Sequence, residues 1–243
     1  MRKPTGFRHK PRNSVRHVLD LLLPRRCLVC GRNRTQLCRA CCAALPRLTP
    51  PLCARCGAPT AWPVERCLEC SGRRLAFASA RAAAPYEDGV RRLVAAWKEH
   101  GLRGLCRTAA AVVAERLPPP DAEAVAFVPA DAGRRLQRGY HPAEQLADEL
   151  ARAWRLPCLT VLRRSGRSRP QRGLALAERR RNVRRSFDSQ PVAGTLVLVD
   201  DVYTTGATAD AAAAALRRAG AAQIDVVTFA RTIRGAGLGL DRG

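Results

Sequence analysis

Lysine, aromatic residues and long apolar runs are all scarce in this chain of 243 residues. Lys3, Lys10 and Lys98 are the only lysines, so arginine supplies nearly all of the positive charge behind a net charge of +23. Such a charge favours phosphate-bearing partners, although GC-rich coding also adds arginine to surfaces that bind nothing. Phe, Trp and Tyr make up 5% of the residues, which leaves no readable aromatic pocket for a nucleobase.

No apolar run reaches the roughly 20 residues that a membrane span requires. The best candidate, residues 18–23, contains Asp20 and leads into Pro24, Arg25 and Arg26 rather than a small-residue cleavage site. We therefore expect a cytoplasmic protein without membrane insertion. Hydrophobic residues make up 47% of the chain, which is enough for a core and excludes disorder throughout.

Cysteine is abundant, with eleven residues, and eight of them form four C-x2-C pairs. In a reducing compartment these pairs are typical of metal sites rather than disulfides, because each C-x2-C turn brings two thiolates to one tetrahedral ion. Gly31 and Gly57 follow the second cysteine of a pair, where a knuckle turn often needs positive φ. We expect two structural zinc ions, bound first by Cys27, Cys30, Cys38 and Cys41, and second by Cys53, Cys56, Cys67 and Cys70.

Two alternatives to this assignment stay open. The four pairs could share metals in a crossed order, and an iron–sulfur cluster would accept the same four thiolates. Tandem pairs favour a metal framework over a redox dithiol. The remaining Cys42, Cys106 and Cys158 are expected to be packed and inert.

From about Leu75, strand and helix patterns alternate along the chain. Apolar runs predict strands over 80–86, 124–128, 196–199 and 224–229. Helical spacing of apolar residues predicts helices over 90–100, 102–117, 142–154 and 207–219. This alternation indicates an α/β fold with a mainly parallel sheet.

One stretch, residues 196–208, combines an apolar strand, two acids and a Thr/Gly loop that opens into an Ala-rich helix. At the carboxyl edge of a parallel sheet, a helix N-terminus can hold a phosphate with its backbone N–H groups. Gly206 and Ala207 permit close approach, Thr204, Thr205 and Thr208 add hydroxyls, and Asp200 and Asp201 can accept hydrogen bonds from vicinal hydroxyls. This order favours a ribose 5-phosphate over the simpler alternative of solvated aspartates before a capped helix. An ATPase P-loop pattern is absent.

The run from Asp200 to Thr208 resembles the phosphoribosyl-pyrophosphate (PRPP) motif of type I phosphoribosyltransferases. From the cysteine pairs to about Thr232, the chain resembles the ComF family, whose better-known members act in DNA uptake during natural competence. This wider match includes Tyr86, Lys98, Val128-Pro129, Arg134, Arg135, Arg138-Gly139-Tyr140, Gln171, Leu174, Arg179, Asn182 and Phe187. It implies a type I phosphoribosyltransferase-like parallel sheet flanked by helices, with a small N-terminal cysteine-rich zinc-ribbon domain.

The same resemblance implies domain bounds and site residues. The expected parts are a basic arm over 1–26, a double zinc ribbon over 27–74, a phosphoribosyltransferase-like domain over 75–233 and a flexible tail over 234–243. Asp200 and Asp201 would be the catalytic residues that bind the ribose hydroxyls of PRPP, and Thr204 to Thr208 would hold its 5-phosphate. Mg²⁺ would arrive with the pyrophosphate, for which Arg134, Arg138 and Lys98 are further binding candidates.

The chain departs from the family pattern at three positions. His141-Pro142 stands where the family usually continues Asn-Gln, and Asp131 adds a negative charge beside the expected anion site. Purine-using relatives carry an acid in place of Thr204, so its absence argues against ordinary purine salvage.

These features support two hypotheses about function. The first is a magnesium-dependent phosphoribosyltransferase whose acceptor is unidentified. The alternative is a non-catalytic, single-stranded-DNA-binding accessory protein of the DNA-uptake machinery that uses PRPP as a regulatory ligand. Residues 133–185 carry fifteen Arg against four acids, which suits a pyrophosphate clamp, a lid over 165–173, a nucleic-acid track or a merely solvated basic face.

Overall fold

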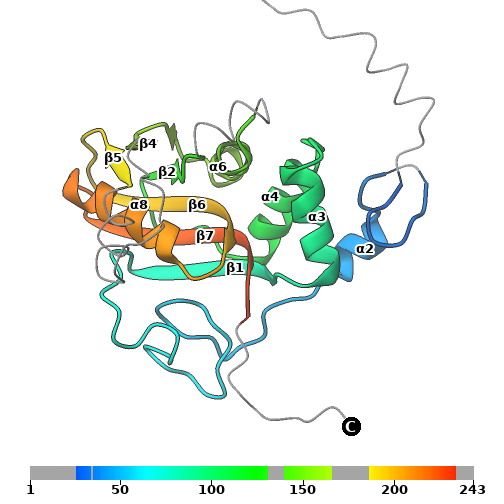
Figure 1. Cartoon of the computed structure of the whole chain (residues 1–243), viewed down its shortest axis with the longest axis horizontal. Helices are drawn as coiled ribbons and strands as arrows, with labels where there is room; N and C mark the ends of the chain where they lie inside the picture. The colour runs from blue at the N-terminus through cyan, green and yellow to red at the C-terminus, as the bar shows by residue number, and fades with distance from the viewer. Residues whose placement is uncertain (1–25, 34, 131–139, 166–185, 234–243) are drawn as a thin grey trace, which may run out of the picture.

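A five-stranded parallel sheet forms the centre of the protein (Figure 1). The computed structural model describes residues 26–33, 35–130, 140–165 and 186–233. The strand order is β1-β7-β6-β2-β3. The strands span Ser79–Pro85 (β1), Ala124–Phe127 (β2), Cys158–Leu159 (β3), Thr195–Tyr203 (β6) and Gln223–Arg231 (β7). The α/β fold class predicted from the sequence is therefore confirmed.

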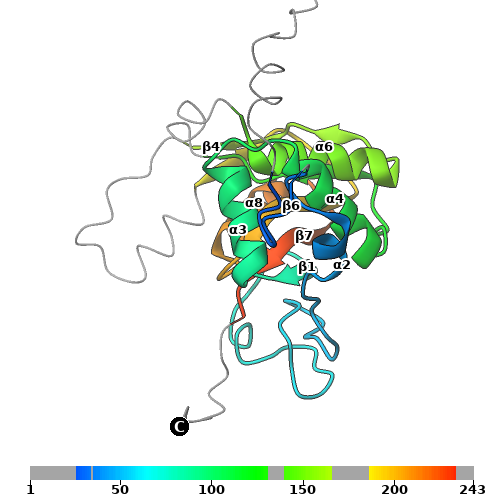
Figure 2. The ribbon, with the colours of Figure 1, turned by 90° about the vertical axis from the view of Figure 1, so that its right-hand side faces the viewer.

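Helices cover both faces of this sheet (Figures 1 and 2). One face packs against α3 (Asp88–Lys98), α4 (Leu105–Arg116) and α6 (Pro142–Trp154). The other face packs against α8 (Ala207–Arg218) and a small antiparallel pair, β4 (Leu162–Arg164) and β5 (Phe187–Ser189). No helix in these described ranges is long and apolar enough to cross a bilayer.

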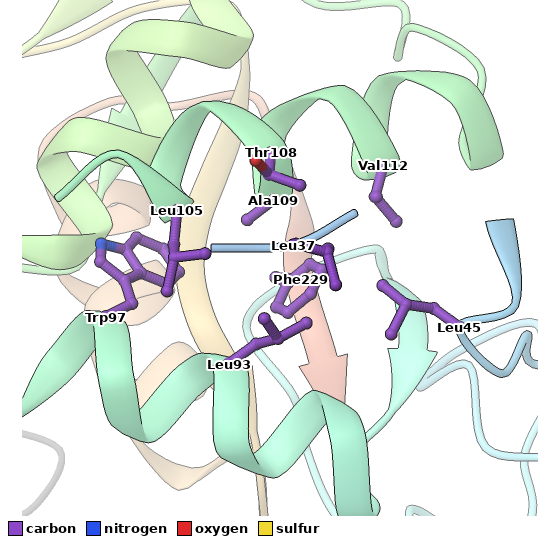
Figure 3. Close-up of a pocket in the computed structure, with 9 residues that line it drawn as sticks. All are labelled: Leu37, Leu45, Leu93, Trp97, Leu105, Thr108, Ala109, Val112 and Phe229. Carbon is purple, nitrogen blue, oxygen red and sulfur yellow. The ribbon is translucent and has the colours of Figure 1, made fainter. Parts of the chain in front are cut away.

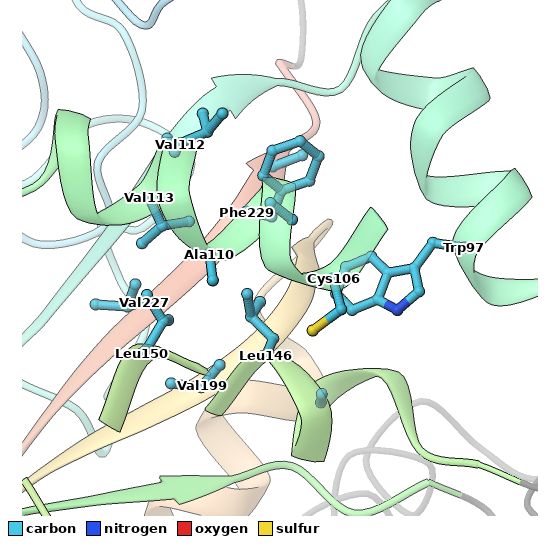
Figure 4. Close-up of a cluster of buried hydrophobic side chains, with 14 of the residues drawn as sticks. Trp97, Cys106, Ala110, Val112, Val113, Leu146, Leu150, Val199, Val227 and Phe229 are labelled. Carbon is cyan, nitrogen blue, oxygen red and sulfur yellow. The ribbon is translucent and has the colours of Figure 1, made fainter. Parts of the chain in front are cut away.

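The core on the three-helix face shows why these segments fold as they do (Figure 4). Alternate residues of the central strands, Val197 and Val199 of β6 and Val227 and Phe229 of β7, are buried beneath the helices. Leu146 of α6 is fully buried among them. The period-2 pattern of the strands and the helical spacing of α6 therefore meet in one apolar layer.

The two cysteine-rich ribbons pack on different parts of the molecule. The first ribbon, residues 27–41, lies against α3 and α4 (Figure 2). Its last residues form the start of the short helix α2 (Arg39–Ala43). Leu37 and Leu45 line a cavity of about 10 Å³ together with Trp97 of α3 (Figure 3). This cavity is too small for a ligand. The second ribbon, residues 53–70, lies along the edge strand β1, where Ala80 N donates to Arg55 O at 2.9 Å.

Most predicted elements form, but several of their ends were wrong: the helix predicted over 90–100 spans Asp88–Lys98, and the strand predicted over 224–229 spans Gln223–Arg231. The strand predicted over 196–199 runs through both acids to Tyr203, because Asp200, Val202 and Tyr203 stay paired with β7. The helix predicted from Leu102 begins at Leu105. The helix over 142–154 is confirmed at both ends.

Candidate functional site

The carboxyl ends of β2 and β6 form a topological switch point in the sheet. These strands are neighbours, yet the chain after β2 passes through α6 to β3, whereas the chain after β6 passes through α8 to β7 on the other side. The two connections therefore diverge on opposite faces. Open parallel sheets bind their ligands in the crevice at this point, beyond the strand ends.

The acid pair lies beside this crevice because β6 is longer than β2. The last pair between the two strands joins Phe127 to Val199, while β6 continues past it along β7. Asp200 and Asp201 are therefore bordered by β7 on one side only. Consecutive residues of a strand face opposite ways, so the two carboxylates leave the strand in different directions.

Asp201 is paired with the lysine that the family resemblance singled out. Lys98 Nζ at the end of α3 lies 2.7 Å from Asp201 Oδ2, and the Asp201 side chain is only 12% exposed. Two candidates that lie about a hundred positions apart in the sequence are thus brought into one site. Within this low-exposure setting, the ammonium compensates the charge of the carboxylate.

Within the described residues Asp200 has no ion-pair partner of this kind, and its carboxylate is hard to ionise. Its Oδ1 accepts from the backbone N–H of Asp201 at 2.9 Å. Burial, followed by the nearby charge of Asp201, raises the pKa of Asp200 to about 8. The free site therefore favours a protonated Asp200 at neutral pH, and a cation or hydroxyl donor that binds there would favour its ionised form.

The loop between β6 and α8 has the geometry of an anion-binding turn. Gly206 adopts φ of 72° and is the N-cap of α8, so it provides no side chain to cap the helix amides. A Cβ at this position would lie 2.2 Å from the Tyr203 hydroxyl oxygen. Thr204, Thr205 and Thr208 are exposed around the turn, and Ala207, partly buried, donates its N–H to Thr205 Oγ1 at 3.2 Å. The first turn of α8 thus offers amides and hydroxyls to a ligand.

The sequence did not predict Arg164 as a site residue. It was counted only as one of the arginines of the basic segment 133–185. It ends β4, and its Nε donates to the carbonyl of Pro129, just beyond β2, at 3.0 Å. Its positive charge also lowers the pKa of Asp200, against the larger effect of burial. Nothing in the local sequence marks Arg164 among its many neighbouring arginines. Arg134 and Arg138, the lid over 165–173, the tail and nearly all of the basic arm lie outside the described residues.

The His141-Pro142 departure has a local structural role. The His141 side chain caps α6 by accepting the N–H of Glu144 at its Nδ1, at 3.1 Å, and Pro142 occupies the first turn. Proline suits this position, because its missing N–H would have no helical partner there.

The eight paired cysteines form two tetrads in the grouping favoured by the sequence, not the crossed one. In each tetrad all four sulfurs lie within 4.8 Å of one another. Cys56 and Cys67 are 3.5 Å apart, Cys53 and Cys70 3.7 Å, and Cys30 and Cys38 3.7 Å. Tetrahedral zinc with Zn–S bonds of about 2.3 Å places its sulfurs about 3.8 Å apart, so the tetrads fit this ion.

The backbone around each tetrad also suits thiolate ligands. Cys38 N–H donates to Cys27 Sγ at 3.4 Å, and Cys67 N–H donates to Cys53 Sγ at 3.3 Å. Burial opposes ionisation, but such backbone donors outweigh it and lower the pKa of Cys27 to about 6 and of Cys53 to about 7. In the same tetrads a side-chain hydrogen bond with Cys38 raises the pKa of Cys41 to about 12 and burial raises that of Cys70 to about 11, so one cysteine of each tetrad ionises most easily. The positive φ expected at the glycines after the knuckles is confirmed, at 74° for Gly31 and 69° for Gly57.

All three unpaired cysteines have little thiolate character, since burial also raises the pKa of Cys42. Burial raises the pKa of Cys106 and of Cys158 to about 12. Both stay protonated at neutral pH, as expected for packed thiols.

Comparisons with known proteins agree with this architecture. Residues 18–71 match the model of the double zinc ribbon domain. Competence protein F of Haemophilus influenzae is 27% identical over 225 residues, which cover 85% of this chain and 96% of that protein. The DNA utilization protein YhgH of Salmonella typhi is 28% identical over 237 residues, covering 88% of this chain and all of that protein. Together with the double zinc ribbon, these two relatives support the assignment of the chain to the ComF family.

The ribbon match decides the metal question for this ComF-family protein. Zinc, rather than an iron–sulfur cluster, is the ion of the double zinc ribbon, and both tetrads are structural zinc sites. All four ligands at each site are cysteines, which leaves no open position for catalysis. No third group of potential metal ligands occurs within the ranges that the structure describes.

Part of the ComF-family chain also aligns with a solved structure, the glutamine phosphoribosylpyrophosphate amidotransferase of B. subtilis in complex with ADP and GMP. The TM-score is 0.35 at 21% identity, over 51% of this chain and 26% of that one. The chain therefore spans about a quarter of the length of this neighbour.

Proposed function

We propose that this ComF-family protein binds PRPP at the carboxyl edge of its sheet and acts as a phosphoribosyltransferase-type protein linked to DNA uptake. The observation that carries the proposal is the N-terminus of α8, whose N-cap residue Gly206 has positive φ and no capping side chain, and which follows the acid pair of β6. We propose the same domain bounds as above, with the ribbons at 27–74 and the ligand-binding domain at 75–233. The link to DNA uptake is supported by the names of the two relatives.

The chemistry of each part suits one portion of the ligand. The amides of the first turn of α8 and the hydroxyls of Thr204, Thr205 and Thr208 would receive the 5-phosphate. Asp200 and Asp201 would accept hydrogen bonds from the ribose hydroxyls. Lys98, which now neutralises Asp201 at 2.7 Å, lies where phosphate oxygens would provide it with a second partner.

As a transferase, the protein would catalyse displacement at the anomeric carbon. The bond from that carbon to the pyrophosphate oxygen breaks, pyrophosphate leaves with the electron pair, and the acceptor forms the new bond. Magnesium, brought in by the pyrophosphate, would neutralise part of its charge. The chain itself would contribute positioning by the loop and acids and stabilisation by Lys98 and Arg164.

Calorimetry with PRPP and magnesium tests the proposal directly. The zinc-loaded wild-type chain should bind, and the Asp200→Asn/Asp201→Asn variant should lose binding while its circular dichroism stays unchanged. Asp121→Asn, at an exposed position far from β6 in the sequence, is the matched control and should bind normally. Equal affinity in the double variant and the control would reject the assignment. Pyrophosphate release across a panel of acceptors, with and without single-stranded DNA, then tests for turnover.

A second candidate function, binding of single-stranded DNA, is favoured by one surface feature. A groove of about 560 Å³ lies between the second ribbon and the end of α8, and three arginines line it: Arg55, Arg217 and Arg218. It lies at the amino end of β7, opposite the acid pair. Affinity for single-stranded DNA should fall steeply with salt, and Arg217→Ala/Arg218→Ala should reduce the slope. Affinity without salt dependence would remove this candidate.

A further inference from the structure

The exit of the second ribbon touches the loop between β6 and α8. Arg73, three residues after the last zinc ligand Cys70, donates from Nη1 to the carbonyl oxygen of Thr205 at 2.7 Å. The backbone N–H of Ala76 donates to Asp210 Oδ1, in the first turn of α8, at 2.7 Å. The segment that leaves the ribbon thus makes hydrogen bonds to both the loop and the start of α8.

A buried arginine joins the ribbon to the underside of the same loop. Arg231, the last residue of β7, is 1% exposed. Its Nη1 donates to the carbonyl of the zinc ligand Cys56 at 2.5 Å, and its Nη2 pairs with Glu69 Oε2, between two other ligands, at 3.0 Å. The guanidinium carbon also lies 5.2 Å from the centre of the Tyr203 ring.

Tyr203 transmits this contact to Gly206. Its ring packs edge-on against Phe77, with centroids 6.4 Å apart, and is 5% exposed. Its hydroxyl lies directly under Gly206, where an added Cβ would come within 2.2 Å of it. A shift of Arg231 would therefore move the Tyr203 ring, which packs directly against Gly206.

The contact of Arg73 also fixes the direction of one amide. In a trans peptide the carbonyl and the N–H point in opposite directions. Because Arg73 holds the Thr205 carbonyl on its own side, the N–H of Gly206 points to the opposite side, away from Arg73. An anion in the turn requires that orientation.

We propose that the second zinc ribbon stabilises the 204–208 turn in its phosphate-binding conformation, with Arg73 and Arg231 as positioning residues. Zinc in this ribbon and a phosphate monoester in the turn then stabilise each other. The first ribbon, which packs on α3 and α4, takes no part. This inference rests on the proposed function, because the turn is taken as the site of the 5-phosphate.

The first experiment compares two neighbouring arginines of the zinc-loaded full chain. Ribose 5-phosphate is the probe, and its affinity is measured by calorimetry. Arg73→Ala should weaken binding about tenfold, the effect of one charge-assisted hydrogen bond. Arg74→Ala removes the same charge at an exposed position and should stay within about twofold of wild type. Arg73→Lys, which can still donate to Thr205, should recover part of the loss. Equal affinities of the two alanine variants would overturn the role of Arg73.

The second experiment measures zinc release to a chromogenic chelator with and without ribose 5-phosphate. Coupling of binding free energies is reciprocal, so at equilibrium with the chelator the ligand should raise the zinc affinity of one of the two sites several-fold and leave the other unchanged. Arg231→Lys, or Glu69→Gln if the buried lysine prevents folding, should abolish this protection. Protection that persists in a folded variant, or that covers both sites equally, would contradict the coupling.

Failure of the proposed function can be told apart from failure of this inference. If the wild-type chain binds neither ribose 5-phosphate nor PRPP, the proposed function fails. Amide hydrogen exchange then decides the ribbon's role without a ligand. Arg231→Lys should speed exchange in residues 204–209 at least about tenfold while leaving α6 unchanged, and unchanged exchange in the loop would refute the inference.

Discussion

Asp200→Asn is predicted to stabilise the free protein while removing its affinity for PRPP. Asp200 sits in a setting that disfavours its charge, since burial and Asp201 raise its pKa to about 8. The ordinary pKa is 3.8, so the folded state holds this proton more tightly than the unfolded chain does. Asparagine keeps the shape and removes the charge.

The sign and size of the effect follow from this difference. A raised pKa in the folded state gives stability that is complete below about pH 4 and is lost as the pH rises to about 8. At about 1.4 kcal/mol per pKa unit, the full difference amounts to at most about 5 kcal/mol near pH 8. Because the side chain is partly exposed and Lys98 and Arg164 can rearrange around it, we expect about 1–3 kcal/mol at pH 8, and almost none only below about pH 4.

Thermal melting of the zinc-loaded chain at several pH values measures this effect. For a protein of this size, each kcal/mol should raise the Tm by about 2–4 °C. The Tm of Asp200→Asn should exceed that of wild type at pH 8 and approach it as the pH falls toward 4, whereas the exposed control Asp121→Asn should show no such trend. A variant that melts below wild type at pH 8 would refute the reasoning that the ionised Asp200 carboxylate destabilises the ligand-free protein.

Three further predictions concern the turn, the ion pair and the zinc. Gly206→Ala should lower stability by about 1–3 kcal/mol in urea, and more than Gly101→Ala, whose φ of 69° is alike but whose Cβ would meet open space. Lys98→Met should destabilise the chain by about 1–3 kcal/mol, and Lys98→Met/Asp201→Asn should recover part of this in a double-mutant cycle, because no lone buried charge remains. Cys53→Ser should lose one of the two zinc ions in a colorimetric assay, and Cys106→Ser should keep both.

Local signals in the sequence were sufficient for much of this fold. The zinc tetrads follow from C-x2-C spacing, because each knuckle is a single turn whose geometry depends on a few consecutive residues. The helix over 142–154 could be predicted at both ends, since Pro142 suits a first turn and the apolar positions repeat through Leu150. The Gly206 turn likewise depends on its own residues.

Tertiary pairing decided what the sequence could not. A strand that meets two aspartates is expected to end there, yet pairing with β7 keeps β6 extended to Tyr203. The two-residue strand β3 and the three-residue strands β4 and β5 are too short to show any period. Arg164 was missed for that reason, since only the fold brings β4 beside the acid pair.

The arginine-rich composition also made it impossible to predict which arginines lie at the proposed site. With 43 Lys and Arg in the chain, any one arginine is expected to be a solvated surface residue. Arg231 differs from the others in its burial and not in its sequence context, because its partner Cys56 lies 175 positions away. Burying a guanidinium is costly unless its charge is paired and its donors are satisfied. Glu69 pairs with Arg231 and the Cys56 carbonyl accepts from its Nη1, but the buried Nε has no hydrogen-bond partner among the described residues. Such a cost is retained where the residue fixes two parts of the chain against each other, so burial singles out Arg231, whereas the less buried Arg73 and Arg164 are identified only by their contacts.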